Sequence, residues 1–370
     1  MKLSISIRLA IGLFALVAAA RAERWHVQYL YDEAKSDLTI NDLAFPTPQR
    51  GVAVGYIDDR QRQRSRGAAV VTSDGGANWS VVPLPDTGLS VFFLNDSIGW
   101  VVTPKGIYRT EEGGRSWKKI PKSPKGTLRV FFHDSQHGYA AGLNKSVSET
   151  TDGGKSWKPL PAVTEVKSDP EYTAFTSISF AGPVGYITGF NQPPRRDDSH
   201  VPDWMEPEKA AVRKEWPSTS ILIGTVNAGK TWGVTSSSLF GHISRVRMSP
   251  DGRGLGLIEF RYNAVFPSEV IAINLKTGHS ESVYADKKRA VTDVALVRSG
   301  PAYLAASEVT GRLRAPIPSA LHILKSDDMK LWKEMEVDYR ANARKSVLAA
   351  VDAQNVWVAT DTGMILKLVP

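Results

Sequence analysis

The sequence predicts an all-β protein made of repeated units of four short strands. The chain of 370 residues holds 30 Gly, 22 Pro and 10 Trp and has only short apolar runs, a composition typical of turn-rich β structure. A polar motif that ends in Trp also recurs along the chain. It reads SDGGANW at 73–79, TEEGGRSW at 110–117, TTDGGKSW at 150–157, TVNAGKTW at 225–232 and KSDDMKLW at 325–332.

Each motif closes a longer unit. Residues 89–120 and 128–160 align as three alternating strands, the motif and a fourth strand, and Trp117 lies 38 residues after Trp79 and 40 before Trp157. Four short strands in about 40 residues match one blade of a β-propeller. We therefore predict a seven-bladed β-propeller over residues 23–370. Its blades are expected at about 38–82, 89–120, 128–160, 175–232, 243–284, 291–337 and 346–370.

Two units depart from the pattern. The fifth lacks the motif, and a turn at 274–278 takes its place, so six or eight blades remain alternatives if this unit is misread. The last unit supplies three strands before the chain ends. The segment 24–32, RWHVQYLYD, alternates apolar and polar residues and is predicted to add the fourth strand and close the ring.

The motif has a structural explanation. Its Asp or Asn side chain can accept hydrogen bonds from the following backbone N–H groups, its Gly residues can adopt positive φ, and its Trp can pack beneath the turn. We expect a clasp between the third and fourth strands, not a metal site, because the carboxylates lie on separate blades; no cofactor is predicted. The residues concerned are Asp74, Gly76, Trp79, Glu112, Gly114, Trp117, Asp152, Gly154, Trp157, Asn227, Gly229, Trp232, Asp327 and Trp332.

The pattern S/T-x-D-x-G-x-x-W resembles the Asp-box, or BNR repeat, of sialidases, sortilin-type receptors and many secreted glycosidases. The full unit, an apolar strand, G-[WY]-x-x-G and then T-x-D-G-G-x-x-W, is most similar to the photosystem II stability/assembly factor family and its non-photosynthetic bacterial relatives. The resemblance is best over residues 39–160 and weaker to 235. It implies a seven-bladed propeller of WD40/YVTN-like architecture that binds a protein, which in photosynthetic members is a photosystem II reaction-centre protein.

The N-terminus predicts export. Lys2 and Arg8 precede an apolar run at 9–20, and residues 20–22 read A-R-A, so residues 1–22 are expected to be a signal peptide cleaved after Ala22. An uncleaved anchor helix is the alternative. No other stretch approaches membrane-spanning length, and we expect a periplasmic or secreted protein. The absence of Cys excludes disulfides and thiolate chemistry. Removal of the signal peptide lowers the net charge from +8 to +5, which does not call for nucleic acid as a partner.

The candidate binding surface is the face opposite the motifs. Four long connections, at 57–67, 191–218 (an insertion in the fourth blade), 261–268 and 307–319, join second to third strands and emerge there. Loops on a rigid scaffold often carry function. Arg side chains suit the binding of carboxylates or phosphates, and Trp and Tyr side chains suit contacts at protein interfaces. The candidate residues are Arg60, Arg62, Arg64, Arg66, Arg195, Arg196, Trp204, Arg213, Trp216, Arg261, Tyr262, Arg312 and Arg314. The alternative is a solvated surface in which carboxylates such as Asp58 and Asp59 pair with these cations.

Two functions are weighed. The first is a non-catalytic, monomeric scaffold that binds a protein or peptide on the looped face. The second is a sialidase-like or other Asp-box glycoside hydrolase or a glycan-binding protein, which would need three Arg, an acidic acid/base and a Tyr activated by Glu; Tyr262 and Glu259 are the candidates for that pair. The F/Y-R-x-P element expected before the first motif is missing, because that region reads AFPTPQRG. The binding scaffold is therefore preferred.

Overall fold

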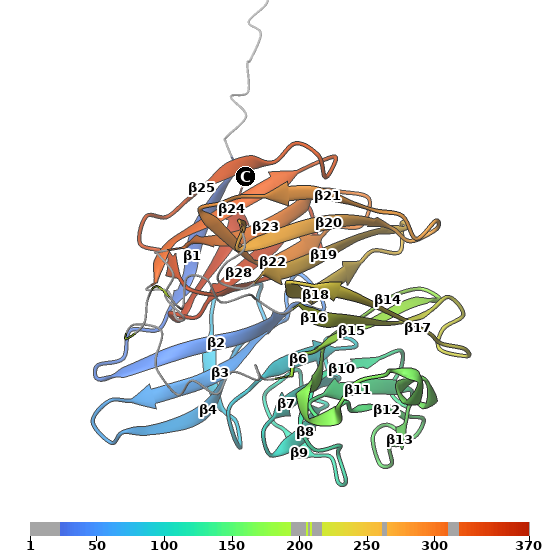
Figure 1. Cartoon of the computed structure of the whole chain (residues 1–370). Coiled ribbons are helices and arrows are strands. Elements are labelled where there is room, and N and C mark those ends of the chain that lie inside the picture. The colour runs from blue at the N-terminus through green and yellow to red at the C-terminus, as the bar shows by residue number, and fades with distance from the viewer. Residues whose placement is uncertain are drawn as a thin grey trace, which may run out of the picture.

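The computed structural model describes residues 23–193, Met205, Glu208, 217–260, 265–309 and 318–369. This part of the chain folds into an all-β structure of antiparallel sheets, as predicted (Figure 1). Two short 3-10 helices, η1 (Pro161–Glu165) and η2 (Pro170–Tyr172), lie between the third and fourth sheets. No helix among the described residues is long and apolar enough to cross a membrane.

Five sheets have four strands each, in chain order. The first is β2 (Ser36–Ala44), β3 (Gly51–Asp59), β4 (Arg64–Thr72) and β5 (Ser80–Pro83). The second is β6 (Ser90–Phe93), β7 (Gly99–Thr103), β8 (Gly106–Thr110) and β9 (Lys118–Lys119), and the third is β10 (Thr127–Phe132), β11 (Gly138–Gly142), β12 (Val147–Thr150) and β13 (Lys158–Pro159). The fourth is β14 (Thr173–Ala181), β15 (Val184–Asn191), β16 (Ser218–Thr225) and β17 (Gly233–Leu239), and the fifth is β18 (Gly241–Met248), β19 (Arg253–Phe260), β20 (Ser268–Asn274) and β21 (Ser280–Ala285).

The remaining strands form one sheet of nine. Its strands are β22 (Arg289–Leu296), β23 (Ala302–Glu308), β24 (Ser319–Ser326), β25 (Lys333–Val337), β26 (Asn342–Ala343), β27 (Ser346–Asp352), β28 (Asn355–Thr360), β29 (Met364–Val369) and β1 (Arg24–Leu30). The N-terminal strand β1 runs antiparallel to β29 and pairs in parallel with β25 at Arg24↔Glu336 and Trp25↔Val337. Both ends of the described chain therefore lie in the same sheet.

The first strands of the repeated units form a closed cycle. Contacts connect β2, β6, β10, β14, β18, β22 and β27 in this order and return from β27 to β2. The apolar core fills the spaces between successive sheets. In three of these spaces aromatic rings stack across the boundary: Phe45 on Trp357, with centroids 3.6 Å apart, Trp100 on Phe132, at 3.7 Å, and Tyr139 on Phe180, at 5.5 Å. Such stacks fix the angle between neighbouring sheets, because a rotation would open the ring contact.

The connection predicted at 57–67 is shorter than expected. β3 continues to Asp59, β4 begins at Arg64, and the register Asp59↔Arg64 closes a hairpin with a turn at 60–63. The carboxylate of Asp59 accepts the N–H groups of Gln61 and Arg62, both at 3.0 Å, and so caps the turn. The segment is polar because the end of the hairpin is exposed, and an exposed strand resembles a loop in sequence.

Candidate binding surface

The motif turns join the third and fourth strands of their sheets. In the turn at 150–157, the Thr150 hydroxyl accepts the N–H of Gly154 at 2.8 Å, and the Asp152 carboxylate accepts the N–H of Ser156 at 2.9 Å. Hydrogen bonds from the Ser156 side chain and backbone lower the pKa of Asp152 to about 2. Thr72 with Asp74 and Thr225 with Asn227 make the same hydrogen bonds. In the second turn Thr110 accepts the N–H of Gly114, and Glu112 accepts the Ser116 hydroxyl.

The turns also join neighbouring sheets. A Cβ added to Gly114, Gly154 or Gly229 would meet a side chain of the preceding sheet, namely Val52 at 2.9 Å, Ile120 at 3.1 Å and Tyr139 at 2.1 Å. All three glycines have positive φ, near 90°. In the first four motifs the closing Trp lies edge-on to a Phe at or just after the end of the first strand, as in Trp157 on Phe132 with centroids 6.2 Å apart, whereas Trp332 lies edge-on to Tyr284 of β21. The turns therefore bind the sheets together, and their carboxylates are occupied by backbone groups.

The last turn corrects one predicted residue. Asp328, and not Asp327, accepts the Ser326 hydroxyl at 3.0 Å and the N–H groups of Lys330 and Leu331 at 2.8 and 2.9 Å. Only six positions separate Ser326 from Trp332, whereas seven separate Thr72 from Trp79. Counting back from Trp therefore gives the wrong carboxylate, because this turn is one residue shorter.

The four arginines of the β3–β4 hairpin divide into two pairs. Arg60 forms an ion pair with Asp37 on β2, and Arg62 Nε lies 3.7 Å from Asp59 Oδ2. The side chains of Arg64 and Arg66 are exposed and make no hydrogen bond or ion pair with another described residue, although the backbone of both residues pairs with β3. They are two positions apart, so they lie on the same face of β4. The alternative of self-paired loops thus holds for two of the four arginines.

The outer edge of β4 is free at the same place. β5 pairs with β4 only at positions 68–71, and the chain that follows bonds once more, through the Leu84 N–H to the Gly67 carbonyl at 3.0 Å. Between Arg64 and Arg66 no strand of the described residues covers the outer edge of β4. A free strand edge with two uncompensated cations is a template for an extended acidic segment.

The other predicted surface residues all lie outside the described residues. They are Arg195, Arg196, Trp204, Arg213, Trp216, Arg261, Tyr262, Arg312 and Arg314.

A cluster that sequence reasoning missed lies inside the cycle of first strands. We call it the axial cluster and define it as Asp42, Arg129, Arg245, Arg247 and Asp293, from β2, β10, β18 and β22. β-bulges at 40–42, 127–129, 243–245 and 291–293 precede Asp42, Arg129, Arg245 and Asp293. A bulge re-aims the side chain that follows it, which explains how residues far apart in sequence converge.

Ion pairs divide the cluster into two groups, Arg129 with Asp42 and the other two arginines with Asp293. Arg129 Nη1 lies 3.5 Å from Asp42 Oδ2, Arg245 Nε lies 3.1 Å from Asp293 Oδ1, and Arg247 Nη2 lies 3.6 Å from Asp293 Oδ2. Both carboxylates also accept backbone N–H groups of the next sheet, of Val91 at 3.1 Å and of Leu348 at 2.9 Å. Burial lowers the pKa of Arg129 to about 10, Asp42 opposes this, and Arg245 and Arg247 lower it further.

One sequence regularity points to the cluster. Asp42, Ser90, Arg129 and Ser177 each stand three residues before the Phe that meets a motif Trp. Of these four residues only Asp42 and Arg129 belong to the axial cluster, because Arg245, Arg247 and Asp293 have no Phe three positions later. A spacing measured from the Phe would therefore have found two of the five cluster residues, but the Trp-based repeat drew attention to the turns.

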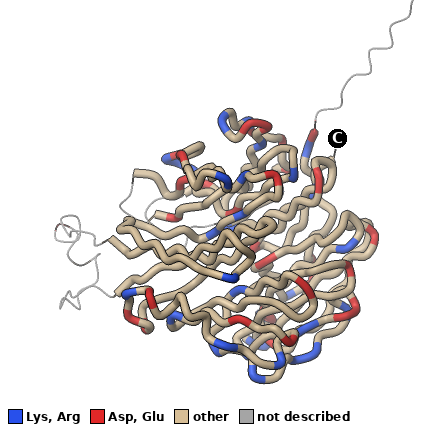
Figure 2. The backbone as a smooth tube through the Cα atoms, turned by 90° about the vertical axis from the view of Figure 1, so that its right-hand side faces the viewer, with Lys and Arg blue, Asp and Glu red and all other residues tan. Residues whose placement is uncertain are grey.

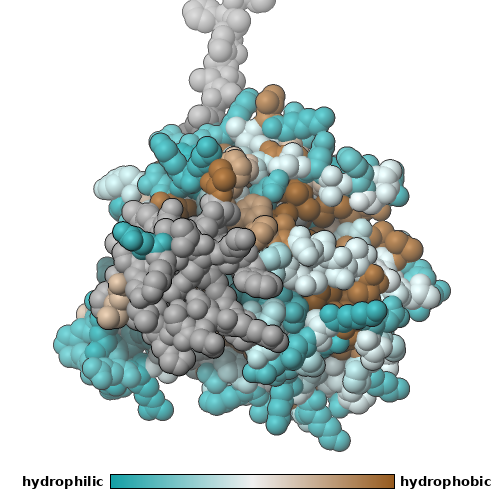
Figure 3. Space-filling view, in the orientation of Figure 1, coloured by the Kyte–Doolittle hydropathy of each residue, from teal (hydrophilic) through white to brown (hydrophobic). Residues whose placement is uncertain are grey.

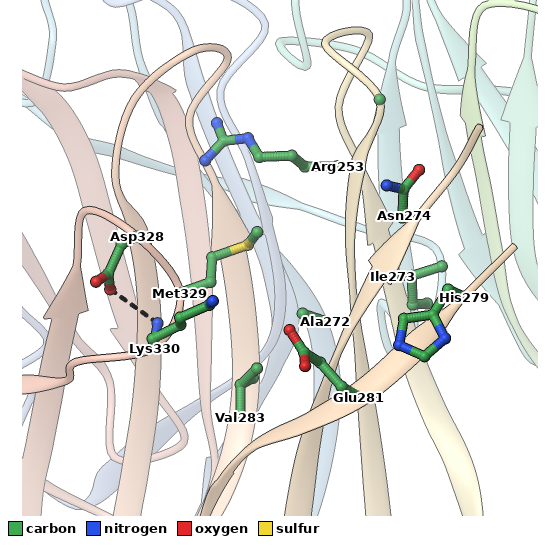
Figure 4. Close-up of a pocket in the computed structure, with 11 residues that line it drawn as sticks. Arg253, Ala272, Ile273, Asn274, His279, Glu281, Val283, Asp328, Met329 and Lys330 are labelled. Atoms are coloured by element: carbon green, nitrogen blue, oxygen red, sulfur yellow. Dashed lines mark hydrogen bonds between the residues drawn. The ribbon is translucent and has the colours of Figure 1, made fainter. Parts of the chain in front are cut away.

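A hollow of about 240 Å³ lies between the fifth sheet and the motif turn at 326–332. Figure 4 shows Met329 near its middle, with Glu281 and His279 on the side of the fifth sheet. The arginine that lines the hollow already has partners, since Arg253 donates hydrogen bonds to the Asp251 carboxylate at 2.8 Å and to the carbonyls of Val297 and Gly300. Arg253 is therefore not free to bind a ligand in the hollow, and we assign the hollow no role.

The surface has neither a single charge sign nor a dominant apolar patch in view. Figure 2 shows Lys and Arg mixed with Asp and Glu, mostly at turns, and Figure 3 shows apolar side chains in strips between hydrophilic ones. Tyr339, Val226 and Leu331, the most exposed large apolar residues described, lie on three different turns. Among the described residues, no three His, Asp or Glu side chains are grouped to hold a metal ion.

Comparison with known proteins agrees with this architecture. The family model described as photosynthesis system II assembly factor YCF48 matches residues 126–194. A structure of YCF48 bound to D1 peptide has a TM-score of 0.60 and 17% identity and covers 94% of this chain and 97% of that one. The structure of YCF48 from Cyanidioschyzon merolae has a TM-score of 0.58 and 17% identity and covers 94% of this chain and 99% of that one.

The same architecture occurs more widely. The extracellular domain of a B. thetaiotaomicron protein gives a TM-score of 0.59 at 10% identity and covers 93% of this chain and 40% of that one. No curated protein sequence matches this chain. Identities this low show the fold alone. The chain is an Asp-box β-propeller that is similar, in the matched segment and in its fold, to the photosystem II assembly factors of the YCF48 type.

Proposed function

We propose that this protein is an exported, non-catalytic scaffold that binds an extended acidic peptide segment of a partner protein. The observation that carries the proposal is the free edge of β4 between Arg64 and Arg66. Backbone groups of the edge can pair with an added strand, and the two guanidinium groups select its charge. Residues two apart on a strand are about 7 Å apart. The partner segment would therefore carry acidic side chains at alternate positions.

The similar proteins support the class of ligand. The structure of YCF48 bound to D1 peptide is an example of a propeller of this shape that holds a peptide. We carry over a peptide as ligand, and not the identity of the D1 segment or a role in photosynthesis. A sialidase-like site receives no support from the described residues, since the candidate Tyr262 lies outside them.

We also propose the finer features of the scaffold. The nine-stranded sheet is counted as two blades, β22–β25 and β27–β29 with β1, joined by the parallel β1–β25 pair; with the five other sheets this gives seven. Support comes from the closed cycle of first strands. The protein would act as a monomer in the periplasm or outside the cell after cleavage behind Ala22, for which residues 1–22 are the evidence.

A peptide titration tests the binding site. The probe is a fluorescent peptide of alternating Val and Glu, with the Val/Gln peptide as its control. Fluorescence anisotropy with residues 23–370 should show binding of the acidic peptide only. Two exposed ion pairs contribute up to about 1 kcal/mol each, so Arg64→Ala with Arg66→Ala should weaken binding about tenfold.

The matched control is Arg60→Ala with Arg62→Ala, which removes the same charge from the same hairpin. Because these arginines already pair with Asp37 and Asp59, the change in affinity should stay within about twofold. Equal losses in the two double variants would mean that net charge, not the β4 edge, attracts the peptide. Retention of glycan oligomers with no peptide binding would return the glycosidase alternative to first place.

A further inference from the structure

The axial cluster has an imbalance of charge that its own residues do not remove. It contains three guanidinium groups and two carboxylates. The carboxylate of Asp293 is fully engaged, because its two oxygens also accept the N–H groups of Val294 and Leu348, both at 2.9 Å, whereas Asp42 meets Val91 and Arg129 through Oδ2. The arginines are not fully engaged. Arg129 reaches Asp42 and the Leu89 carbonyl through Nη1, while its buried Nε has no partner among the described residues.

Although this Nε is buried, other parts of the arginine side chains can still be reached by solvent. The side chain of Arg129 is 23% exposed and that of Arg247 is 36% exposed, whereas Asp293 is fully buried. Arg245 and Arg247 both act electrostatically on Arg129, and Asp42 and the half-buried Glu259 of β19 act on Arg245, so the groups share one region although they come from different sheets. Three cations in a region of reduced dielectric repel one another unless a further anion is present.

We propose that the axial cluster binds a small oxyanion, such as phosphate, sulfate or a carboxylate, between Arg129 and Arg247. The oxyanion accepts hydrogen bonds from the unused guanidinium N–H groups and neutralises the excess positive charge. Arginine suits this role, because its planar fork presents two parallel donors to oxyanions. Since the arginines come from β10 and β18 and their carboxylates from β2 and β22, the anion also stabilises the cycle of strands. This site goes beyond the peptide edge proposed on β4 and does not depend on it.

The test uses residues 23–370 with phosphate, sulfate and acetate as probes and chloride at the same ionic strength as the reference. Isothermal titration gives the affinity, and the thermal midpoint gives the stabilisation. A ligand that binds only the folded state raises the midpoint, by about 2 °C or more once its concentration is well above Kd. Binding of phosphate or sulfate but not of acetate would identify a site for tetrahedral anions. Binding of acetate as well would extend the site to carboxylates.

Two substitutions should move the affinity in opposite directions. Arg247→Gln removes the most exposed cation while Arg245 and two backbone groups still hold Asp293, so oxyanion affinity should fall at least about tenfold. Asp42→Asn keeps an acceptor for the Val91 N–H and adds one net positive charge to the cluster, so affinity should rise. The matched control is Arg298→Gln, which removes an exposed arginine outside the cluster and should leave the affinity unchanged.

The outcomes separate clearly. A midpoint shift that is the same in Arg247→Gln and in Arg298→Gln, or the same with chloride, would overturn the proposal. The proposal would also be overturned if about 50 mM phosphate, a concentration far above the Kd of a specific site, produced neither binding heat nor a shift of the thermal midpoint. In that case the cluster is a self-contained latch between sheets. If Asp42→Asn fails to fold in chloride, folding restored by phosphate still supports the site, and no restoration speaks against it.

Discussion

The substitution Gly229→Ala tests whether the motif turns join the sheets. Gly229 has a φ of 86°, a conformation that costs a residue with Cβ about 1–2 kcal/mol. The added Cβ would also lie 2.1 Å from the Tyr139 hydroxyl. Tyr139 cannot move away easily, because it is fully buried, stacks on Phe180 and lies edge-on to Trp232. Such overpacking costs about 1–3 kcal/mol, so the total should be about 2–5 kcal/mol.

A second glycine separates the backbone cost from the clash. Gly182 also has positive φ, 59°, but a Cβ there would meet nothing within 4 Å. Gly182→Ala should therefore cost only about 1–2 kcal/mol. Urea unfolding followed by far-UV circular dichroism measures both variants against the unchanged protein.

The clash can also be relieved from the other side. After the hydroxyl, the nearest atom to the added Cβ is Tyr139 Cζ at 3.2 Å, so Tyr139→Phe removes the severe contact. Tyr139→Phe alone loses a hydrogen bond to Glu149 at 3.2 Å, worth about 1 kcal/mol. Combined with Gly229→Ala it should lose less stability than the sum of the two single changes. If Gly229→Ala costs no more than Gly182→Ala, or if the two changes simply add, the turn does not press on the preceding sheet.

Three further predictions concern the turns and the N-terminal strand. The pKa of Asp152 is lowered to about 2 in the folded protein, below its value in the unfolded chain. The ionised carboxylate therefore contributes its full share of folding stability above about pH 4, and this share is lost as the pH falls through about 2. Asp152→Asn should make the thermal midpoint depend less on pH in that range. Asp328→Ala should lower the midpoint of the same urea unfolding assay, and Asp327→Ala should lower it much less, because only the former loses the turn hydrogen bonds. Deletion of residues 23–30 exposes the edges of β25 and β29, so size-exclusion chromatography should show association; a stable monomer would contradict this.

The first three sheets were predictable because each of these units is closed by a strong local pattern. A Gly pair and a Trp at fixed spacing determine a turn whatever lies elsewhere in the chain, so the strand boundaries follow within a few residues. The same locality explains the misplaced Asp327. Once the turn shortens by one residue, the distance from Trp no longer identifies the carboxylate, and only the hydrogen bonds of Asp328 do.

The binding surfaces were harder to predict. The hairpin was read as a loop because its strands are exposed beyond the sheet, so Arg64 and Arg66 show no apolar alternation there. The partners of Arg60 and Arg62 could not be foreseen in full either, since Asp37 belongs to another strand. For the axial cluster the reason is sequence distance: Asp42 and Arg129 are separated by a whole unit, and their contact depends on bulges that no local pattern reveals.

The two proposed sites can be distinguished by competition. The edge of β4 lies at the end of a hairpin beyond its fourth strand, whereas the axial cluster lies within the cycle of first strands. A peptide held only along Arg64 and Arg66 leaves the cluster free, so phosphate at constant ionic strength should not displace it. If phosphate does displace the peptide, and Arg247→Gln weakens both ligands, a carboxylate of the peptide must reach the axial cluster. The partner segment would then extend from the hairpin to the centre of the cycle, and the oxyanion site would be part of the peptide site.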